Sequence, residues 1–375
     1  MKIGYEAKRV FKNFTGLGNY SRSVIQTLAE AFPEDSFYLY TPQVTSNNRL
    51  DFLKTLKNVF VRTPSTKSFK AFWRSFGLAK DAKRDEIELF HGLSHEIPFG
   101  LKSKKIKSVV TIHDLIFLIY PQYFKFVDRQ IYRIKFRHAC KNADTIIAIS
   151  KQTKQDIIHY FGTEEQKIKV VYQGCDPIFY ELPQTEKYVH IQKTYDLPNI
   201  FLLCVGTLEN RKNQLLIIKA LLHLQKDIKL VLVGKSTNYK ETLTTFITGN
   251  QLDDRVIFLG NIPFQDLPSM YHLAQIFVYP SYFEGFGIPI LEALNCGVPV
   301  IAAKGSCLEE AGGKSSIYIN PNNDLELADK INLVLNDEAL KQKMIADGKH
   351  FALNFRADII AHNLMEVYTN TLSAC

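Results

Sequence analysis

Two carboxylates flank a glycine-rich loop in the second half of the chain. In the string YPSYFEGFGIPILEALNCG, seven residues separate Glu284 in the loop from Glu292, which we expect in the first turn of the following helix. Glycines let a ligand approach the backbone, and the free N–H groups at a helix start, here near Gly287 and Ile288, bind phosphate oxygens. Carboxylates accept hydrogen bonds from hydroxyls, so the loop suits a diphosphate with hydroxylated rings on both sides. The alternative is that Glu292 only complements the helix dipole and Glu284 is a surface charge.

A pair of adjacent cations, Arg211 and Lys212, lies in a second loop that reads GTLENRKN. Such a pair can neutralise a departing diphosphate and so stabilise a leaving group. An isolated pair of loop cations is usually solvated and idle. Two loops suited to phosphate, each directly after a predicted strand of one sheet, favour the functional interpretation.

Short apolar runs alternate with helical patterns across the second half, which predicts a parallel sheet with helical crossovers. The expected strands are 200–205, 228–233, 255–259, 275–279, 298–302 and 316–319, and the expected helices are 213–224, 239–248, 265–272, 289–296 and 324–335.

The first half alternates less cleanly but predicts a second doubly wound domain. We expect strands at 2–5, 37–40, 58–61, 87–90, 108–112, 145–149 and 168–171, and helices at 18–31, 69–79, 128–142 and 151–160, the last with Ser150 as its N-cap. Residues 176–199 lose the alternation and contain three prolines, so we expect a linker there. The predicted domains are 1–180 and 190–355, followed by a helix at 357–372.

Composition narrows the classes of protein further. The chain has 375 residues, 46% of them apolar, and a net charge of +8. Residues 1–180 hold 29 Lys and Arg against 17 Asp and Glu, whereas residues 181–375 hold 17 against 21, so the first domain is expected to face something anionic. No Cys-x-x-Cys occurs, the N-terminus does not read as a signal peptide, and no apolar run is long enough to span a membrane.

The strings VG-x-L-x-x-RKN and PSYFEGFGIPILEALNCGVPVIA closely resemble glycosyltransferase family 4, retaining enzymes of the GT-B fold. The resemblance implies two doubly wound Rossmann-like domains facing a cleft, with the terminal helix crossing back to the first. It also implies that the cation pair binds the donor diphosphate and that Glu292 binds the ribose. Glu284, with the backbone at Phe286 and Gly287, would lie against the donor sugar, and Ile288 would complete the donor site.

Two features of the first half resemble further parts of that family. Gly16 and Gly18, in TGLGNY, resemble its N-terminal glycine loop, which closes on the phosphates. They do not form a dinucleotide fingerprint, because Ser21 stands where Gly or Ala is needed. His113 follows a predicted strand and resembles the family's histidine that contacts the donor sugar. The alternatives are a flexible loop and a structural histidine.

Other clusters leave their function open. His91 and His95 lie four residues apart without a third ligand, so we expect no metal there and favour an acceptor-side loop. Cations between 125 and 141 are interleaved with Phe124, Phe126, Tyr132 and Phe136. This pattern predicts either a surface for a membrane or lipid-phosphate acceptor, or a solvated helix whose aromatic residues enter the core.

Together these features predict a retaining, metal-independent glycosyltransferase that needs no cofactor. Glu284, His113, Arg211 and Lys212 would be catalytic. The donor would be a nucleoside-diphosphate hexose, with GTLENRKN favouring mannose, and the acceptor a saccharide or lipid-linked molecule in polysaccharide synthesis. We expect a cytoplasmic protein, associated with the inner face of the membrane, and no nucleic-acid partner.

Three other functions compete with this interpretation. A nucleotide-sugar epimerase or sugar phosphorylase on the same scaffold is the first alternative, and a non-enzymatic binder of anions or nucleic acid is the second. A kinase or NTPase is disfavoured, because the two GKS strings have Lys229 and Leu308 where the phosphate-binding loop needs glycine.

Overall fold

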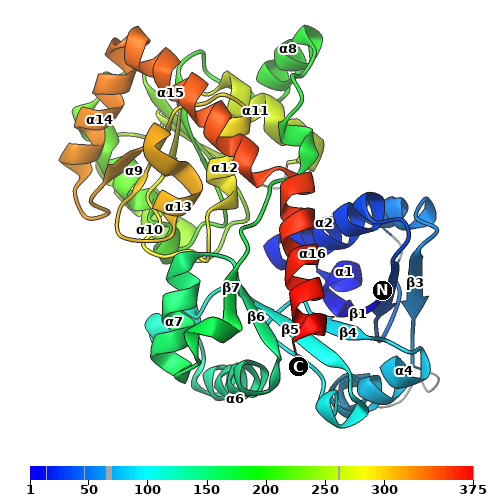
Figure 1. The fold of residues 1–375 in the computed structure, drawn as a ribbon. Coiled ribbons are helices and arrows are strands. Elements are labelled where there is room, and N and C mark those ends of the chain that lie inside the picture. Colours follow the sequence, from blue (N-terminus) through cyan, green and yellow to red (C-terminus); the bar gives the residue numbers. More distant parts are fainter. Residues whose placement is uncertain (14, 46, 65–69, 261, 375) are drawn as a thin grey trace. The chain divides into compact units, whose positions relative to one another are not determined.

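The computed structural model describes residues 1–13, 15–45, 47–64, 70–260 and 262–374, and it divides the chain into two compact units (Figure 1). The first unit comprises Met1–Gln173 together with Ala357–Cys375, and the second comprises Gly174–Arg356. Each unit is a parallel sheet with helices, so the predicted two-domain, doubly wound α/β fold is confirmed.

The first unit contains a seven-stranded parallel sheet with the order β3-β2-β1-β4-β5-β6-β7. All seven predicted strands are present, because runs of β-branched and aromatic residues are buried on both faces of a parallel sheet. The strands are β1 (Lys2–Glu6), β2 (Ser36–Tyr40), β3 (Val59–Arg62), β4 (Leu89–Gly92), β5 (Lys107–Ile112), β6 (Thr145–Ala148) and β7 (Ile168–Val170).

The helices of this unit match the sequence pattern in part. They are α1 (Lys8–Lys12), α2 (Gly16–Ala31), α3 (Lys70–Phe72), α4 (Leu78–Arg84), α5 (Ile116–Ile119), α6 (Phe126–Asn142), α7 (Lys151–Phe161) and α16 (Ala357–Ser373). Ser150 caps α7 as predicted, accepting a hydrogen bond from the backbone N–H of Thr153. The expected single helix at 69–79 is instead split by a π-helical turn, Trp73–Gly77, and residue 69 lies outside the described residues. The Trp73 indole lies against Gly77, where a Cβ would come within 2.8 Å of the ring.

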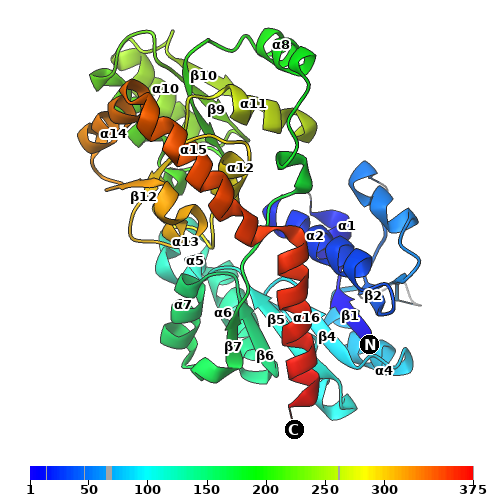
Figure 2. The ribbon, with the colours of Figure 1, turned by 45° about the horizontal axis from the view of Figure 1, so that its top comes forward.

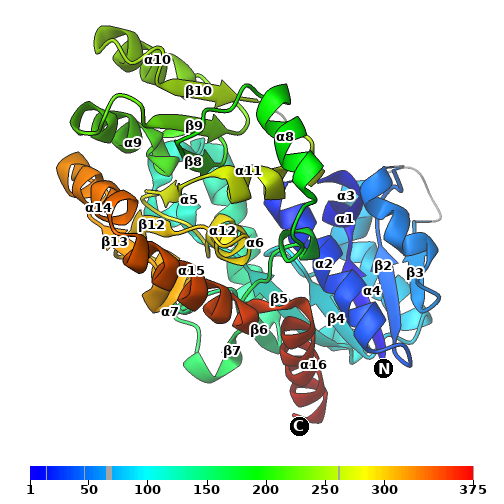
Figure 3. The ribbon, with the colours of Figure 1, turned by 90° about the horizontal axis from the view of Figure 1, so that it is seen from above.

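The second unit contains a six-stranded parallel sheet with the order β10-β9-β8-β11-β12-β13. All six predicted strands are confirmed: β8 (Phe201–Val205), β9 (Lys229–Val233), β10 (Val256–Leu259), β11 (Ile276–Tyr279), β12 (Val300–Ala303) and β13 (Ile317–Ile319). Figure 3 shows β10, β9 and β8 side by side in this order.

Five helices of the second unit lie where the pattern predicts them, and three were missed. Those predicted are α9 (Gln214–Ala220), α10 (Tyr239–Gly249), α11 (Leu267–Leu273), α12 (Ile288–Asn295) and α14 (Asp324–Asn336). Those missed are α8 (Thr185–Thr194), α13 (Leu308–Gly312) and α15 (Glu338–Ala352). The expected linker at 176–199 is therefore partly helical: α8 packs against α11, and its only fully buried residue is Ile191. A single buried position gives too weak a periodic signal to reveal a helix.

The last helix, α16, packs within the first unit although it follows the second unit in the chain. It lies beside α2 and β5 (Figure 2). Its buried residues Ile360, Leu364 and Tyr368 share a hydrophobic core with Ile3 and Tyr5 of β1.

Candidate donor-binding site

The two predicted phosphate loops are neighbours in the second unit. The chain proceeds from β8 to β9 and β10 on one side, then returns to place β11 on the other side of β8. Ligands of open α/β sheets bind at this reversal of strand order, beyond the carboxyl ends of the strands. The loops that follow β8 and β11 carry Arg211, Lys212 and Glu284, so the fold places all three at that point.

The side chains of Arg211, Lys212 and Glu284 form a compact ionic cluster. Arg211 Nη1 lies 2.9 Å from Glu284 Oε2, and Lys212 Nζ lies 2.6 Å from Glu284 Oε1. The three side chains are only 16%, 13% and 11% exposed, so solvent screens them little. Burial alone would raise the pKa of Glu284, but Lys212 and Arg211 lower it to about 2. Glu284 is thus ionised at neutral pH and is not an idle surface charge.

Further contacts fix the two loops relative to one another. Arg211 Nη1 donates to the carbonyl of Phe283 at 2.5 Å, and the N–H of Tyr282 donates to the carbonyl of Arg211 at 2.9 Å. Lys212 Nζ also donates to the hydroxyl of Tyr279 at 2.6 Å, and that hydroxyl lies 3.2 Å from Glu284 Oε1. These contacts consequently hold the Arg211 and Lys212 side chains in one conformation.

A buried cysteine, Cys307, contacts the backbone of the glycine loop. Its Sγ donates to the carbonyls of Glu284 at 3.1 Å and Phe286 at 3.2 Å. Tyr271 and Tyr279 lie in or beside apolar runs, whereas Cys307 lies in the polar stretch KGSCLEE. Nothing in their spacing marks the three as parts of one site.

The glycine loop ends where α12 begins. Gly287 is the residue before the helix, with φ of +130°, and a Cβ there would lie 3.1 Å from Leu308 Cδ2 and 3.2 Å from the Cβ of Ala311. Ile288 opens the helix, and no side chain caps this end. The side chain of Phe286 is buried and packs against Phe355, so only its backbone is placed to meet a ligand.

Glu292 lies one turn further along α12 and has a neutral partner. It falls beyond the first turn, so the expectation that it sits in the first turn is wrong, and its interaction with the helix dipole is correspondingly weaker. The buried Tyr271 hydroxyl donates to Glu292 Oε2 at 2.7 Å. Burial raises the pKa of Glu292 to about 7, although the Tyr271 hydrogen bond lowers it.

Gly16 and Gly18 lie in the first turn of α2 rather than in a flexible loop. A Cβ on Gly18 would lie 1.7 Å from the carbonyl oxygen of Asn13, so close backbone packing requires glycine there. A Cβ on Gly16 would meet no atom of the described residues within 4 Å. Only Gly16 therefore borders open space that a ligand could enter.

His113 follows β5, as predicted, but its ring is already bonded within the first unit. Nε2 lies 2.9 Å from the carbonyl oxygen of Leu93, and Nδ1 lies 2.9 Å from Nε2 of Gln173. Because a carbonyl only accepts, Nε2 carries the proton and Nδ1 accepts from Gln173. Burial lowers the pKa of His113 to about 4, so the ring is neutral at pH 7. To bond a donor sugar, the ring must first give up one of these partners.

The neighbouring histidines are also satisfied by protein groups. His91 Nδ1 lies 2.7 Å from the Tyr368 hydroxyl and Nε2 lies 2.8 Å from Thr111 Oγ1, while His95 Nδ1 accepts from the N–H of His113. Within the described residues, no group of three or more His, Cys, Asp and Glu is arranged to hold a metal ion.

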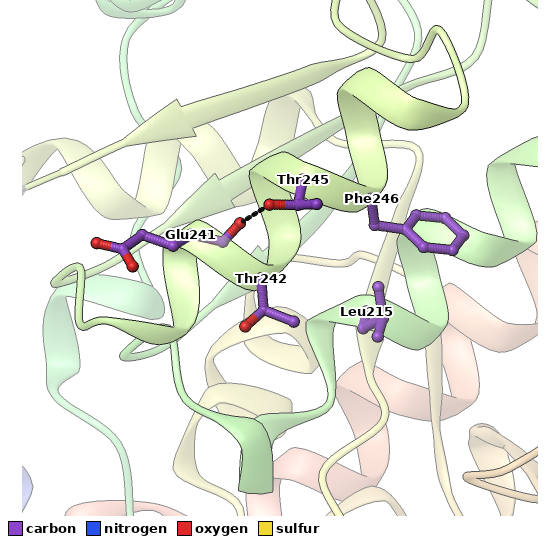
Figure 4. A pocket seen from close by; sticks show the side chains of 5 residues that line it. All are labelled: Leu215, Glu241, Thr242, Thr245 and Phe246. Carbon is purple, nitrogen blue, oxygen red and sulfur yellow. Dashed lines mark hydrogen bonds between the residues drawn. The ribbon is translucent and has the colours of Figure 1, made fainter.

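A separate open hollow lies between α9 and α10 (Figure 4). Its lining contains one carboxylate and no cation, so it does not have the chemistry of a diphosphate site. The lining residues are Leu215, Glu241, Thr242, Thr245 and Phe246.

Comparison with known proteins agrees with the geometry. Residues 189–351 match the family model for glycosyl transferases group 1, and residues 16–178 match that for glycosyltransferase family 4. The chain belongs to the family 4-like glycosyltransferases. The two matched ranges between them carry the ionic cluster, the glycine loop, Gly16, Gly18 and His113.

Individual relatives span nearly the whole of this glycosyltransferase. It is 27% identical to O-antigen chain mannosyltransferase B of Escherichia coli, over 95% of this chain and 96% of the relative. It is 26% identical to O-antigen chain mannosyltransferase RfbU of Salmonella typhimurium, over 84% of this chain and 86% of the relative.

Solved structures establish the GT-B fold. A glycosyltransferase from Rickettsia africae superposes with a TM-score of 0.79 at 18% identity, covering 100% of this chain and 99% of that one. Anabaena Alr3699/HepE, in complex with UDP and glucose, superposes with a TM-score of 0.76 at 21% identity, covering 99% of this chain and 100% of that one.

Proposed function

We propose that this glycosyltransferase moves a hexose, most consistently mannose, from a nucleoside-diphosphate sugar to a saccharide or lipid-linked acceptor in polysaccharide synthesis. The observation that carries the proposal is the cluster of Arg211, Lys212 and Glu284 at the reversal of strand order. The names of the O-antigen mannosyltransferases from E. coli and S. typhimurium support mannose and a saccharide acceptor.

In this proposal each part of the site has a separate task. When the bond between the anomeric carbon and the diphosphate oxygen breaks, its electron pair goes to the diphosphate and positive charge develops on the sugar. Arg211, Lys212 and the N–H groups at the start of α12 stabilise the diphosphate. Glu284 holds both cations and shields the positive sugar, and Glu292 accepts hydrogen bonds from the ribose hydroxyls.

Retention of the anomeric configuration and independence from metal are parts of the same proposal. The acceptor attacks from the face that the diphosphate leaves, and a diphosphate oxygen takes the acceptor's proton. The guanidinium and the ammonium supply the charge that a divalent cation would otherwise provide, so we expect no cofactor. We keep His113 as a donor-sugar contact, reached when Gln173 releases Nδ1.

We place the enzyme in the cytoplasm, in contact with the inner face of the membrane. No helix in the described part of the chain is long and apolar enough to cross a bilayer. The excess of cations in residues 1–180 supports contact with an anionic surface instead.

A thermal-shift screen of nucleotide sugars tests the proposal directly. A ligand at 100 times its Kd stabilises the folded protein by about 2.7 kcal/mol, and at equal concentration the nucleotide sugar with the lowest Kd stabilises it most. GDP-mannose should therefore raise the melting temperature more than the same concentration of UDP-glucose or UDP-N-acetylglucosamine does. Lys212→Met should abolish that shift and the transfer activity, whereas the exposed Lys226→Met should change neither. A full thermal shift and full turnover in Lys212→Met would contradict the role that the proposal gives to the ionic cluster.

Product analysis separates the remaining alternatives. NMR of the product should show the donor's anomeric configuration, and turnover should survive EDTA. An epimerase would convert the nucleotide sugar without any acceptor, and a phosphorylase would require free phosphate.

A further inference from the structure

The outward side of α6 is apolar where a solvated helix would be polar. Val127, Ile131 and Ile134 are 66%, 45% and 68% exposed. Together with His138 they follow at intervals of four, three and four residues, which places them on one side of a helix. Phe136, by contrast, is buried. The expectation that the aromatic residues of this segment enter the core therefore holds for Phe136 and fails for Phe126 and Tyr132, which are 68% and 39% exposed.

Three phenylalanine rings in successive contact extend this outward side beyond the helix. The ring of His138 lies 3.9 Å from that of Phe99, centroid to centroid. Phe99 stacks on Phe76 at 4.9 Å with an interplanar angle of 9°, and Phe76 lies 5.0 Å from Phe72. These phenylalanines are 42%, 55% and 62% exposed, respectively. We call the outward side of α6 and the three rings the apolar strip; it consists of Val127, Ile131, Ile134, His138, Phe99, Phe76 and Phe72.

Cations lie beside the α6 part of the apolar strip. Helix α6 carries five Lys and Arg against a single acid, Asp128. Arg137 and Lys141 are exposed and stand beside Ile134 in the helical projection, while Lys135 stands on the other side and pairs with Glu96 at 3.0 Å. Phe99, which joins the helix to the other two phenylalanines, is followed closely in the chain by Lys102, Lys104 and Lys105, all exposed.

An apolar strip with lysine and arginine beside it suits a lipid bilayer better than it suits another protein. Interfaces with other proteins bury apolar residues but are depleted in lysine. A helix that lies in the plane of a bilayer shows apolar and aromatic residues on one side, with Lys and Arg beside them to meet lipid phosphates. Scattered exposed apolar residues are ordinary on a protein surface, but a contiguous strip of them marks an interaction site.

We propose that the apolar strip inserts into the headgroup region of an anionic phospholipid bilayer, with the bordering cations on the lipid phosphates. The inference rests on the proposed function, because it names the surface through which the enzyme contacts the membrane that would carry its acceptor. The face involved belongs to the first unit alone. It is separate from the ionic cluster that would bind the donor, so the two can be tested independently.

Co-sedimentation with vesicles tests the proposal on the full chain. Wild-type protein should bind vesicles of phosphatidylcholine with 30% phosphatidylglycerol and should bind pure phosphatidylcholine weakly, and salt should reduce the binding. The double variant Ile134→Gln, Phe76→Ser should lose at least fivefold in partition coefficient. Arg137→Gln with Lys141→Gln should lose the preference for phosphatidylglycerol.

Controls separate this surface from general effects. Leu182 and Val189 are 75% and 62% exposed in the second unit, so Leu182→Ser with Val189→Gln removes similar apolar area elsewhere and should leave vesicle binding unchanged. All variants should keep the wild-type thermal shift with a nucleotide sugar, which reports on the proposed function separately.

Three outcomes would overturn the inference. The first is wild-type protein that binds neither kind of vesicle. The second is a strip variant that binds as well as wild type. The third is sedimentation velocity that shows self-association abolished by the strip variant without any vesicle binding, which would make the strip an interface between copies of the chain.

Discussion

At the scale of single residues, the ionic cluster depends on all of its members. Arg211 and Lys212 share one carboxylate, Glu284, and each of the three side chains is less than one-fifth exposed. Removing Glu284 leaves Lys212 without a carboxylate partner, whereas Arg211 keeps an ion pair with Glu209 at 2.5 Å. Removing either cation leaves the buried Glu284 with one ion pair instead of two, which costs more than the lost contact alone. Variants at these positions will therefore change stability as well as catalysis.

The first prediction concerns Glu284. Glu284→Gln keeps the shape of the side chain but removes the charge that both cations share. We expect the free energy of unfolding at pH 7 to fall by about 1 to 3 kcal/mol and transfer to be lost. Urea unfolding followed by circular dichroism measures the first effect. The exposed Glu366→Gln is the matched control, and an unfolding curve of Glu284→Gln that overlays wild type would contradict the description of the cluster as mutually dependent.

The second prediction concerns Glu292 and the pH dependence of donor binding. The pKa of Glu292 is raised to about 7, so its carboxylate form, the better acceptor for ribose hydroxyls, is gained as pH rises through 7. Donor affinity should therefore increase between pH 6 and 8. Tyr271→Phe removes a hydrogen bond that lowers this pKa, so the midpoint should move to higher pH. A profile of Kd against pH that keeps its midpoint in Tyr271→Phe would exclude this coupling.

The same group has an opposite effect on stability. Its pKa in the folded state, about 7, exceeds the ordinary value of 4.5, so the folded protein binds the proton more tightly than the unfolded chain does. Its contribution is present below pH 4.5 and is lost as pH rises through 7. Glu292→Gln should therefore be more stable than wild type at pH 8, by on the order of 1 to 3 kcal/mol, and gain nothing at pH 4.5. Denaturant unfolding at the two pH values measures the difference.

At the scale of elements, the site depends on glycines where chain segments touch. The third prediction compares Gly18 with Gly16 at the start of α2. Gly18→Ala would force a Cβ to within 1.7 Å of the Asn13 carbonyl, whereas Gly16→Ala meets nothing within 4 Å. We expect Gly18→Ala to melt at least 5 °C below wild type, and Gly16→Ala to be as stable as wild type or slightly more so. Equal melting temperatures would show that the start of α2 is not packed as described.

All thirteen strands were predictable from the sequence because each contains a short run rich in apolar residues. The central strands, such as β8 and β11, are buried on both faces, whereas β3 and β10 at the sheet edges are only partly buried. The position of both phosphate loops at the carboxyl ends of strands of one sheet followed from the rule for parallel sheets. The strand order that makes the two loops neighbours, and the contact of Arg211 with Glu284, come from the structure. Helices with few buried positions could not be predicted from the sequence. Helix α15 fully buries only Met344, Gly348 and Ala352, and small residues give a weak periodic signal.

The supporting residues of the site could not be predicted for a different reason. Tyr271 lies in an apolar segment that fits a core interpretation, and Cys307 lies in a polar stretch that matches no motif. Only three-dimensional proximity reveals that they contact Glu292 and the glycine loop. The bonded state of His113 depends on Gln173, sixty residues away in sequence. Sequence spacing identifies side chains that are able to bind a ligand or catalyse a reaction. The residues that hold those side chains in place are revealed only by the tertiary structure.

At the scale of the whole molecule, the chain leaves the first unit once and returns to it in its last helix. Tyr368 of α16 is fully buried, and its hydroxyl lies 2.7 Å from His91 of β4 and 3.4 Å from the hydroxyl of Tyr5 of β1. The core of the first unit is thus completed by residues that follow the second unit in the chain. A stability defect in α16 should consequently appear in strands near the N-terminus rather than in the sequence neighbours of α16.

The fourth prediction tests that connection. Tyr368→Ala removes a large buried side chain and should destabilise the first unit by about 3 to 5 kcal/mol. Hydrogen exchange followed by mass spectrometry should then show faster exchange in β1 and β4, with β8 and β11 unchanged. Glu366→Ala, at an exposed position of the same helix, should leave all four strands unaffected. Faster exchange confined to the second unit would mean that α16 stabilises the unit it follows, and uniform acceleration would mean that the two units unfold as one.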